Sequence, residues 1–425
     1  MSNRRSFSNE NRLPKWYVKA AKMLQAVKEK KESLNNLIFS QDNTHVQIKS
    51  IYGLVTKALQ HSEELDKMLK ILKDKSDETS HFEEFKARIL LTELFWGKLR
   101  LPDVPGNNNV KVILANQDRL SSIPINDDSN FKSAMPRYVR INTLFTTKEY
   151  VLEHLAQDSW EIVETPITYN RFLKRCAKLS EPNFMVDFHY DDLLVFPAKT
   201  PIYRHCLYQS GVFILQAKSS CIPVKILDPK PGDVVMDMCA APGMKTTQIA
   251  AHLENKGVVH AVEVNEKRFN LLEKILHDHG VTCAKTHNSD LLSLKPEDFP
   301  DVTHILLDPS CSNSGMDRAD VEAKSEEQIR QLSSFQTKSL FHALSFPNVK
   351  RIVYSTCSIH SLENEAVIEC VMKVNNDKFR VLEDLPMSED FSRGSDEFEF
   401  GKHGVYFHSQ KHQTTGFFFC AIERK

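Results

Sequence analysis

The stretch "DVVMDMCAAPGMKTTQIAAHL", residues 233–253, contains the signals of a strand, a tight turn and a helix in close succession. Apolar residues open it, small residues and a proline form the turn, and the remaining residues suit a helix. The turn lacks the glycine-rich fingerprints of dinucleotide and nucleoside-triphosphate sites. Its small residues let a ligand approach the backbone, and the helix behind it begins with unpaired N–H groups that favour an anion. The stretch therefore predicts a ligand site between a strand and a helix.

Four more apolar runs follow, separated by helical segments. They are "GVVHAVEV" (257–264), "VTCAK" (281–285), "THILLD" (303–308) and "RIVYST" (351–356). Apolar strands that alternate with helices form βαβ units, whose parallel sheet is covered by helices on both faces. The sequence therefore predicts an α/β domain with a mostly parallel sheet, and such sheets bind ligands beyond the carboxyl ends of their strands.

The composition is that of a globular protein. The chain has 425 residues, 41% hydrophobic and 26% charged, which suits two or three domains. Its polar, basic start and the absence of an apolar run of roughly 18 residues argue against a signal peptide and a membrane span. The nine cysteines include no CxxC pair, which argues against a disulfide framework and a zinc site. We therefore expect reduced thiols, no metal and no membrane.

The region before this domain divides into three parts. Apolar side chains recur with the helical period in the first part: Trp16, Ala20, Met23, Leu24, Val27, Leu34 and Leu37. We expect a helical region over 1–102, and a linker rich in Pro, Asn, Ser and Asp over 103–136. Strand-like and helical patterns over 137–205 predict a small α/β domain, and the larger α/β domain occupies 206–425.

Acidic residues follow the second and third strands of the larger domain. Glu263 comes about 20 residues after the turn, where an acid can accept hydrogen bonds from ribose hydroxyls. Asp290 follows the third strand. A ligand with an amino-acid carboxylate, a ribose and an adenine fits this series, which points to S-adenosylmethionine. The simpler interpretation, that each acid caps a helix or turn, stays open.

Two cysteines lie just beyond the fourth and fifth strands, Cys311 in "DPSCSNSG" (308–315) and Cys357 in "YSTCS" (354–358). Free cysteines are commonly buried filler, but two fillers would not need to share the ligand-binding edge. Methyl transfer needs a thiol when carbon 5 of a pyrimidine is the target, because a thiolate that adds to carbon 6 makes carbon 5 nucleophilic. The addition builds negative charge on the ring, and Asp308 lies where an acid can approach N3.

These two motifs and "DMCAAPGMKT" (237–246), in this order and spacing, resemble the Fmu/Sun family of RNA cytosine-5 methyltransferases. The likeness is to the eukaryotic members that modify large-subunit ribosomal RNA. It covers roughly residues 135–425, and the first 130 residues are only weakly similar to the helical N-terminal region of those members. The resemblance implies a Rossmann-like class I methyltransferase domain with a mostly parallel seven-stranded sheet, preceded by a small RNA-binding domain.

The resemblance also implies a role for each motif residue. It makes Cys357 the nucleophile, gives Cys311 proton removal or product release, and places Asp308 at N3 of the base. It assigns a set of residues to the S-adenosylmethionine site: Cys239, Ala240, Ala241, Pro242, Gly243, Met244, Lys245, Glu263, Arg268, Asp290 and Asp308. The implied substrate is a cytosine of large-subunit ribosomal RNA or a preribosomal particle, swung out of its stack. The implied protein is a monomer in the nucleus or nucleolus.

Three positions depart from the family pattern. The family usually has Asp at the position of Glu263, whose longer side chain can still reach both ribose hydroxyls. Many members have Gly at the position of Asn313, and Asn tolerates a left-handed turn. Where many members have a second Gly, this chain has Met244, whose side chain must point away from the ligand or cover it. None of these departures removes a reacting group.

Other functions stay open at this point. A non-catalytic ribosomal RNA-binding assembly factor has no use for two thiols at one sheet edge. DNA enzymes of this chemistry place the nucleophile in a Pro-Cys motif after the fourth strand, and here Pro309 is followed by Ser310. A transfer RNA cytosine-5 methyltransferase remains an alternative. The basic stretch "YNRFLKRCAK" (169–178) suits phosphate contacts, although a solvated helix face would explain it as well.

Overall fold

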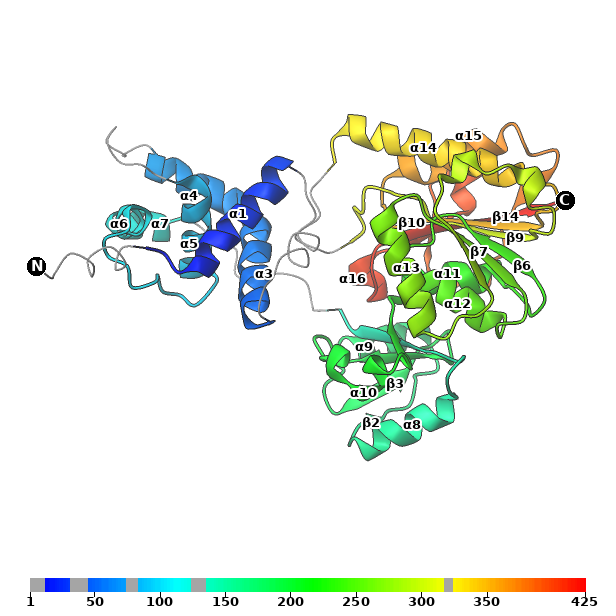
Figure 1. The fold of residues 1–425 in the computed structure, drawn as a ribbon, viewed down its shortest axis with the longest axis horizontal. Helices are drawn as coiled ribbons and strands as arrows, with labels where there is room; N and C mark the ends of the chain where they lie inside the picture. Colours follow the sequence, from blue (N-terminus) through cyan, green and yellow to red (C-terminus); the bar gives the residue numbers. More distant parts are fainter. Residues whose placement is uncertain (1–11, 31–44, 74–82, 124–134, 317–323) are drawn as a thin grey trace, which may run out of the picture. The chain divides into compact units, whose positions relative to one another are not determined.

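The computed structural model describes residues 12–30, 45–73, 83–123, 135–316 and 324–425 (Figure 1). The described residues divide into two compact units, one over 12–123 and one over 135–316 and 324–425. Among the helices in these described ranges, none combines the length and the apolar character needed to cross a bilayer.

The first unit is helical, as its apolar period predicts. Its larger helices are α1 (Lys15–Lys30), α3 (His45–Gln60), α4 (Ser62–Lys73) and α5 (Glu84–Phe95). The predicted inward residues that the structure describes are buried in one core or packed against it: Trp16, Ala20, Met23, Leu24 and Val27. Leu34 and Leu37, predicted for the same face, lie outside the described residues.

The expected linker over 103–136 is wrong for much of its length. Residues in this range form helices α6 (Asn108–Ala115) and α7 (Gln117–Ser121). The Asn107 side chain caps α6, and Val110, Ile113 and Leu120 are buried in the core of the helical unit. The polar composition hid a short amphipathic pattern, because Asn is as suited to a helix cap as to a loop. Residues 124–134 of the expected linker lie outside the described residues.

The second unit begins with a small five-stranded sheet. Its order is β2-β3-β4-β1-β5, with helices α8, α9 and α10 in its connections. The elements are β1 (Arg137–Ile141), α8 (Lys148–Gln157), β2 (Glu161–Ile162), α9 (Tyr169–Cys176), β3 (Asn183–Val186), β4 (Leu193–Phe196), α10 (Cys206–Gln209) and β5 (Phe213–Leu215). Strand β5 pairs with β1 and lies past residue 205, so the small sheet extends beyond the expected range.

The large sheet contains the five predicted strands in parallel. They are β6 (Val234–Asp237), β7 (Val258–Val262), β8 (Ala284–His287), β9 (His304–Leu307) and β10 (Arg351–Thr356). Their order is β10-β9-β6-β7-β8, so the chain reverses its direction of winding between β6 and β9. The α/β class is therefore confirmed, and the reversal creates a crevice at the carboxyl ends of β6 and β9.

The expected count of seven mostly parallel strands needs correction. The sheet has nine described strands, because β11 (Phe379–Val381), β12 (Ser392–Arg393), β13 (Val405–Phe407) and β14 (Phe417–Arg424) extend it beyond β10. All four join through antiparallel pairs, so the sheet is mixed. Three of them are only two or three residues long, too short for a periodic signal in the sequence.

Alternating residues of each central strand face two separate cores. Val235, Leu306 and Val353 face one core, which includes residues of α11 (Lys218–Leu227) and α12 (Met244–His252). Their neighbours Ile305 and Ile352 face the other, which includes residues of α14 (Glu326–Leu344) and α15 (Glu365–Met372). Figure 1 shows these helices on the two faces of the sheet, with α13 (Glu266–Asp278) beside α12.

The small and large sheets are joined by buried polar contacts. Lys218 Nζ of α11 lies 2.8 Å from Asp187 Oδ2 of the small domain, and both side chains are fully buried. Arg140 of β1 donates through Nη2 to Thr247 Oγ1 and to the carbonyl oxygen of Met244, at 2.8 and 3.2 Å. The small domain therefore holds the first turn of α12, the helix that follows the predicted ligand loop.

The Lys218–Asp187 pair gives a stability prediction. Lys218→Met leaves the Asp187 carboxylate buried without its cation, so the free energy of unfolding should fall by about 3–5 kcal/mol. Adding Asp187→Leu removes the unpaired charge and should recover much of that loss. Urea unfolding followed by fluorescence measures both changes.

The exposed pair Lys230–Asp228 is the matched control. Its Nζ–Oδ1 distance is 2.6 Å, but its side chains are 67% and 50% exposed. Lys230→Met should cost less than about 1 kcal/mol, because water screens the pair. Equal losses for Lys218→Met and Lys230→Met would contradict a structural role for the buried pair.

Candidate active site

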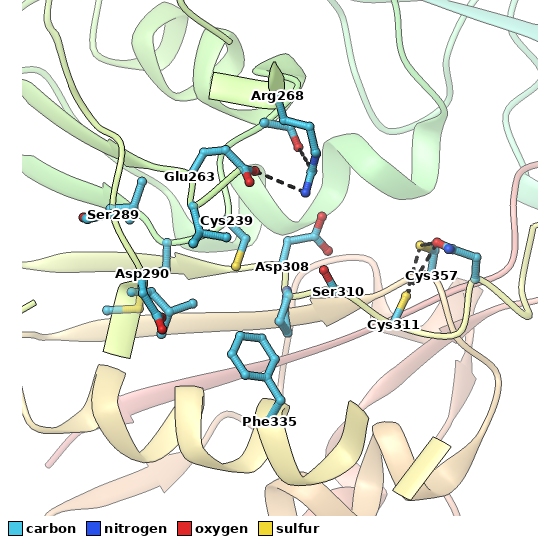
Figure 2. A pocket seen from close by; sticks show the side chains of 17 residues that line it. Cys239, Glu263, Arg268, Ser289, Asp290, Asp308, Ser310, Cys311, Phe335 and Cys357 are labelled. Atoms are coloured by element: carbon cyan, nitrogen blue, oxygen red, sulfur yellow. Dashed lines mark hydrogen bonds and ion pairs between the residues drawn. The ribbon is translucent and has the colours of Figure 1, made fainter. Parts of the chain in front are cut away.

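A cavity of about 330 Å³ opens at the carboxyl ends of β6, β7, β9 and β10 (Figure 2). It lies at the crevice that the reversal of strand order predicts. Its lining combines the predicted acids and thiols with apolar side chains: Met238, Cys239, Ala241, Val262, Glu263, Val264, Arg268, Ser289, Asp290, Leu291, Asp308, Pro309, Ser310, Cys311, Asn313, Phe335 and Cys357.

The loop over 239–245 contributes less to the cavity wall than expected. Cys239 and Ala241 line the cavity, whereas Ala240, Pro242, Gly243, Met244 and Lys245 do not. Gly243 has φ +113°, and a Cβ there would lie 3.1 Å from Leu272. Its need for glycine therefore comes from the turn and from close packing against α13. Burial, with several carboxylates nearby, raises the pKa of Cys239 well above its usual range.

Glu263 is buried at the end of β7, and both of its carboxylate oxygens have partners. Oε1 accepts the N–H of Asn265 at 2.9 Å, and Oε2 lies 3.2 Å from Arg268 Nη1. Arg268 also donates through Nη2 to the carbonyl oxygen of Ala241 at 2.6 Å. Each carboxylate oxygen has two acceptor sites, so Glu263 can still accept from a ligand.

Asp290 lies at the opposite end of the cavity from Cys311 and Cys357 (Figure 2). Its Oδ1 accepts the N–H of Leu292 at 2.9 Å, which caps a short 3-10 turn. The capping alternative is therefore observed, and Asp290 also lines the cavity. Phe335 of α14 adds an aromatic ring to this wall and had no signal in the sequence beyond its helical position.

Asp308 follows β9 and is held by two neighbours. Lys245 Nζ lies 2.6 Å from Asp308 Oδ2, and Ser355 Oγ donates to Oδ1 at 2.8 Å. Burial alone would lower the pKa of Lys245, but the ion pair with Asp308, together with the nearby Cys357 and Asp237, outweighs burial and raises it. Lys245 therefore stays a cation beside the carboxylate, although it does not line the cavity.

The two predicted thiols lie side by side. Cys311 Sγ and Cys357 Sγ are 3.3 Å apart, and Figure 2 shows them at one end of the cavity. Cys311 is only 7% exposed, whereas Cys357 is partly exposed. The hydrogen bond to Cys357, with burial, raises the pKa of Cys311 well above its usual range. Cys357 Sγ also donates to Asn313 Oδ1 at 2.9 Å.

A buried carboxylate that the sequence analysis missed connects the two cysteine loops. Glu363 Oε1 accepts the N–H of Ser312 at 2.9 Å, and Oε2 accepts the hydroxyl of Ser358 at 2.6 Å. These serines directly follow Cys311 and Cys357. Gln336 Nε2 of α14 donates to the same Oε1 at 3.0 Å. The only sign of Glu363 in the sequence is the acidic pair "ENE" (363–365) after an apolar strand and a turn. That pattern is equally typical of the start of a helix.

One group of possible metal ligands occurs among the described residues. The ligand atoms of His154, Asp158 and Cys206 lie within 4.8 Å of one another, on α8, directly after it and on α10 of the small domain. Asp158 Oδ2 is also 3.2 Å from His205 Nε2. The three side chains are thus held by contacts with one another and with His205.

Two family models match the chain. One, described as 16S rRNA methyltransferase RsmB/F, matches residues 224–423. The other, described as the ferredoxin-like domain of NOL1/NOP2/Sun domain family member 5, matches residues 135–216. The second range covers the small sheet through β5, in agreement with the strand pairing.

Solved structures share the fold. PH0851 has a TM-score of 0.69 at 19% identity, and covers 97% of this chain and 99% of its own. A methyltransferase homolog from Pyrococcus horikoshii has a TM-score of 0.56 at 24% identity, over 85% of this chain and 99% of its own. At these identities the likeness shows the fold alone, and it confirms the expected fold.

Two curated relatives match nearly end to end. A 28S rRNA (cytosine-C(5))-methyltransferase of Drosophila melanogaster is 36% identical, over 97% of each chain. A protein of the same name from Mus musculus is 33% identical, over 96% of this chain and 90% of its own. The chain therefore belongs to the same family as these RNA cytosine-C5 methyltransferases, as its three motifs predict.

Proposed function

We propose that the protein transfers a methyl group from S-adenosylmethionine to carbon 5 of a cytosine in large-subunit ribosomal RNA, through a covalent bond between Cys357 and carbon 6. The observation that carries the mechanism is the 3.3 Å contact between two thiols at the mouth of a cavity lined by acids. The names of the relatives support ribosomal RNA as the substrate and, with it, a nuclear or nucleolar location.

Cys357 is the better placed of the two thiols for attack, because it is the more exposed. Its thiolate forms the S–C6 bond, and the π electrons of the C5–C6 bond become available at carbon 5. When bound, S-adenosylmethionine would supply an electrophilic methyl group: carbon 5 would bond to it, and the electron pair of the broken S–CH₃ bond would stay on the cofactor's sulfur. The proton on carbon 5 then leaves, the double bond forms again, and the S–C6 bond breaks so that sulfur keeps its electron pair.

The Lys245–Asp308 pair is placed to stabilise the ring during attack. Negative charge develops on N3 and on the exocyclic oxygen as the thiolate adds. Asp308 lines the cavity with the Lys245 ammonium 2.6 Å behind it, so a proton can pass from Lys245 through Asp308 to N3 and cancel this charge. We assign N3 contact to Asp308 and charge stabilisation to Lys245. We assign removal of the carbon 5 proton and product release to Cys311, which touches the attacking sulfur.

The cavity fits S-adenosylmethionine by its chemistry. The first turn of α12, next to Cys239 and Ala241, offers N–H groups to the amino-acid carboxylate. Glu263 can accept ribose hydroxyls, with Arg268 fixing its orientation. Asp290 can accept from an amino group at the far end, and Phe335 offers a ring face. The remaining residues of 239–245 act by shaping the turn.

Contact with RNA beyond the target base is assigned to the small domain. Helix α9 buries Tyr169, Phe172 and Cys176, which turns a row of cations to solvent. Arg171, Lys174, Arg175 and Lys178 line a groove of about 430 Å³ with the loop over 164–167, and none of them has an ion pair with a described residue. Cations without protein partners suit phosphates. This groove favours a phosphate-contacting face over a merely solvated helix.

The first prediction concerns the cofactor. Asp290→Ala removes a carboxylate that faces the cavity, so affinity for S-adenosylmethionine should fall about tenfold. Isothermal titration measures the change. Asp233→Ala is the control, since Asp233 also accepts a backbone N–H, from Lys230, but lies outside the cavity. Equal affinities for the two variants would remove Asp290 from the site.

The second prediction separates the two thiols. Cys357→Ala should abolish methylation and leave no protein bound to RNA, because no S–C6 bond forms. Cys311→Ala should allow attack and transfer but slow release, so protein accumulates on RNA as a band that survives denaturing electrophoresis. The band should vanish in the double variant. If Cys357→Ala traps the adduct instead, the roles are exchanged, and unchanged methylation in both variants would disprove the covalent mechanism.

The third prediction concerns the groove of α9. Lys174→Ala with Arg175→Ala should weaken RNA binding and reduce the magnitude of the slope of log K against log salt by about 1.4–1.8. The reason is that binding then neutralises two fewer phosphates and releases fewer counterions. The matched control is Lys230→Ala with Lys256→Ala. These two exposed cations precede β6 and β7, at the amino ends of the strands of the large sheet. Equal slopes in both double variants would place the RNA elsewhere.

A further inference from the structure

Asn313 lies between the two thiol-bearing loops in a backbone conformation that most residues avoid. Its φ is +58°, in the left-handed region that Gly and Asn tolerate. The following residues fix the loop, because Gly315 N–H donates to the carbonyl oxygen of Cys357 at 3.0 Å. Backbone needs alone would be met by Gly, which tolerates a positive φ without a side chain. The side chain of Asn313 is therefore an addition to the site.

The amide of this side chain touches both sulfurs. Cys357 Sγ lies 2.9 Å from Asn313 Oδ1, and Cys311 Sγ lies 3.8 Å from the same oxygen. Asn313 also lines the cavity, on the side where the base must enter to reach Cys357. The contact thus joins a neutral polar group to the atom that forms and breaks the bond to carbon 6.

An amide can serve either protonation state of a thiol. Its oxygen can accept a hydrogen bond from the S–H group. A rotation of 180° about the Cβ–Cγ bond exchanges the oxygen with the NH₂ group, which can donate to a thiolate. Hydrogen bonds to an ionised partner are stronger than those between neutral groups, so the contact favours the thiolate. The amide therefore stabilises the thiolate without adding a negative charge near the pyrimidine ring, which itself becomes negative when the thiolate adds.

The charged and titratable groups around Cys357 do not themselves provide a free, uncharged amide that can donate to its thiolate. Lys245 of α12 acts on Cys357 through its positive charge, but its ammonium is held by Asp308. Cys311 can donate one S–H from the loop after β9. Glu363, after β10, has its oxygens engaged by Ser312, Ser358 and Gln336. Among the described neighbours, Asn313 supplies an uncharged amide whose Oδ1 is in contact with the sulfur and whose NH₂ group can take that place.

We propose that Asn313 is a catalytic residue of this chain: its amide stabilises the thiolate of Cys357 before attack on carbon 6 and again when the S–C6 bond breaks. The proposal rests on the proposed function for its place in the cycle. No atom is transferred to or from the amide. The thiol proton goes to solvent before attack, and the electron pair of the S–C6 bond returns to sulfur on release.

Two variants test the amide while keeping the loop. Asn313→Gly retains the left-handed backbone and removes the donor, whereas Asn313→Asp keeps the shape and introduces a carboxylate beside the sulfur. The first readout needs neither RNA nor cofactor: the rate at which iodoacetamide alkylates Cys357, followed by peptide mass spectrometry against pH. The midpoint should move up by about one pH unit in Asn313→Gly and further in Asn313→Asp.

The second readout is the pH dependence of RNA methylation. In Asn313→Gly the rise of kcat/KM with pH should move in the same direction, with a loss of about tenfold at neutral pH that shrinks at high pH. The control is Asn255→Gly, which replaces another left-handed Asn, of φ +56°, that does not line the cavity. It should leave both profiles unchanged.

The outcomes distinguish this proposal from the proposed function. If wild type fails to methylate RNA but the alkylation midpoint still moves in the order Gly then Asp, the contact with the thiolate stands and the proposed reaction fails. If wild type is active and both profiles of Asn313→Gly match wild type, the proposal is overturned. A loss of activity that is equal at every pH, with an unchanged alkylation midpoint, would show that Asn313 only shapes the loop, and also overturns it.

Discussion

The carboxylate of Glu363 is the constraint on which the geometry of the thiol pair depends. The two cysteines come from loops that follow different strands, and a parallel sheet by itself brings such loops only to the same edge. Glu363 accepts hydrogen bonds from the residue after each cysteine, and is itself fully buried. A buried carboxylate left without donors is costly, so the network favours the one arrangement in which both loops reach it. The 3.3 Å contact between the thiols follows from that arrangement.

A second set of buried polar contacts extends this order to the small domain. Arg140 is 1% exposed and reaches from β1 to the first turn of α12, where it binds Thr247 and the carbonyl oxygen of Met244. The same helix carries Lys245, which binds Asp308. The small domain is thus connected to the Asp308 carboxylate through one helical turn. A domain that is expected to hold RNA and a helix that holds the reacting centre are parts of one packed unit.

The sequence predicted the position of the proposed reacting groups better than it predicted the residues that support them. Cys311, Cys357 and Asp308 follow apolar strands, so the rule that parallel strands present their carboxyl ends at one edge was enough to bring them together. Glu363 and Arg140 gave no such signal, because a buried charge looks like a surface charge until its partners are known. The same ambiguity explains the helices found at 108–121, where polar residues cap and flank apolar ones. Residues of 239–245 were assigned to the ligand, yet Gly243 is explained by its turn and by Leu272.

The contact between the thiols also bears on the order of events. The raised pKa of Cys311 has the hydrogen bond to Cys357 as its largest cause, ahead of burial. Before attack, Cys311 therefore keeps its proton. Once Cys357 has bonded to carbon 6, its sulfur is a neutral thioether and a weak acceptor, so the largest cause of the raised pKa is gone. Cys311 becomes more acidic at the stage at which a base must take the proton from carbon 5. In the proposed cycle, one sulfur–sulfur contact thus protects the helper thiol before attack and releases it afterwards.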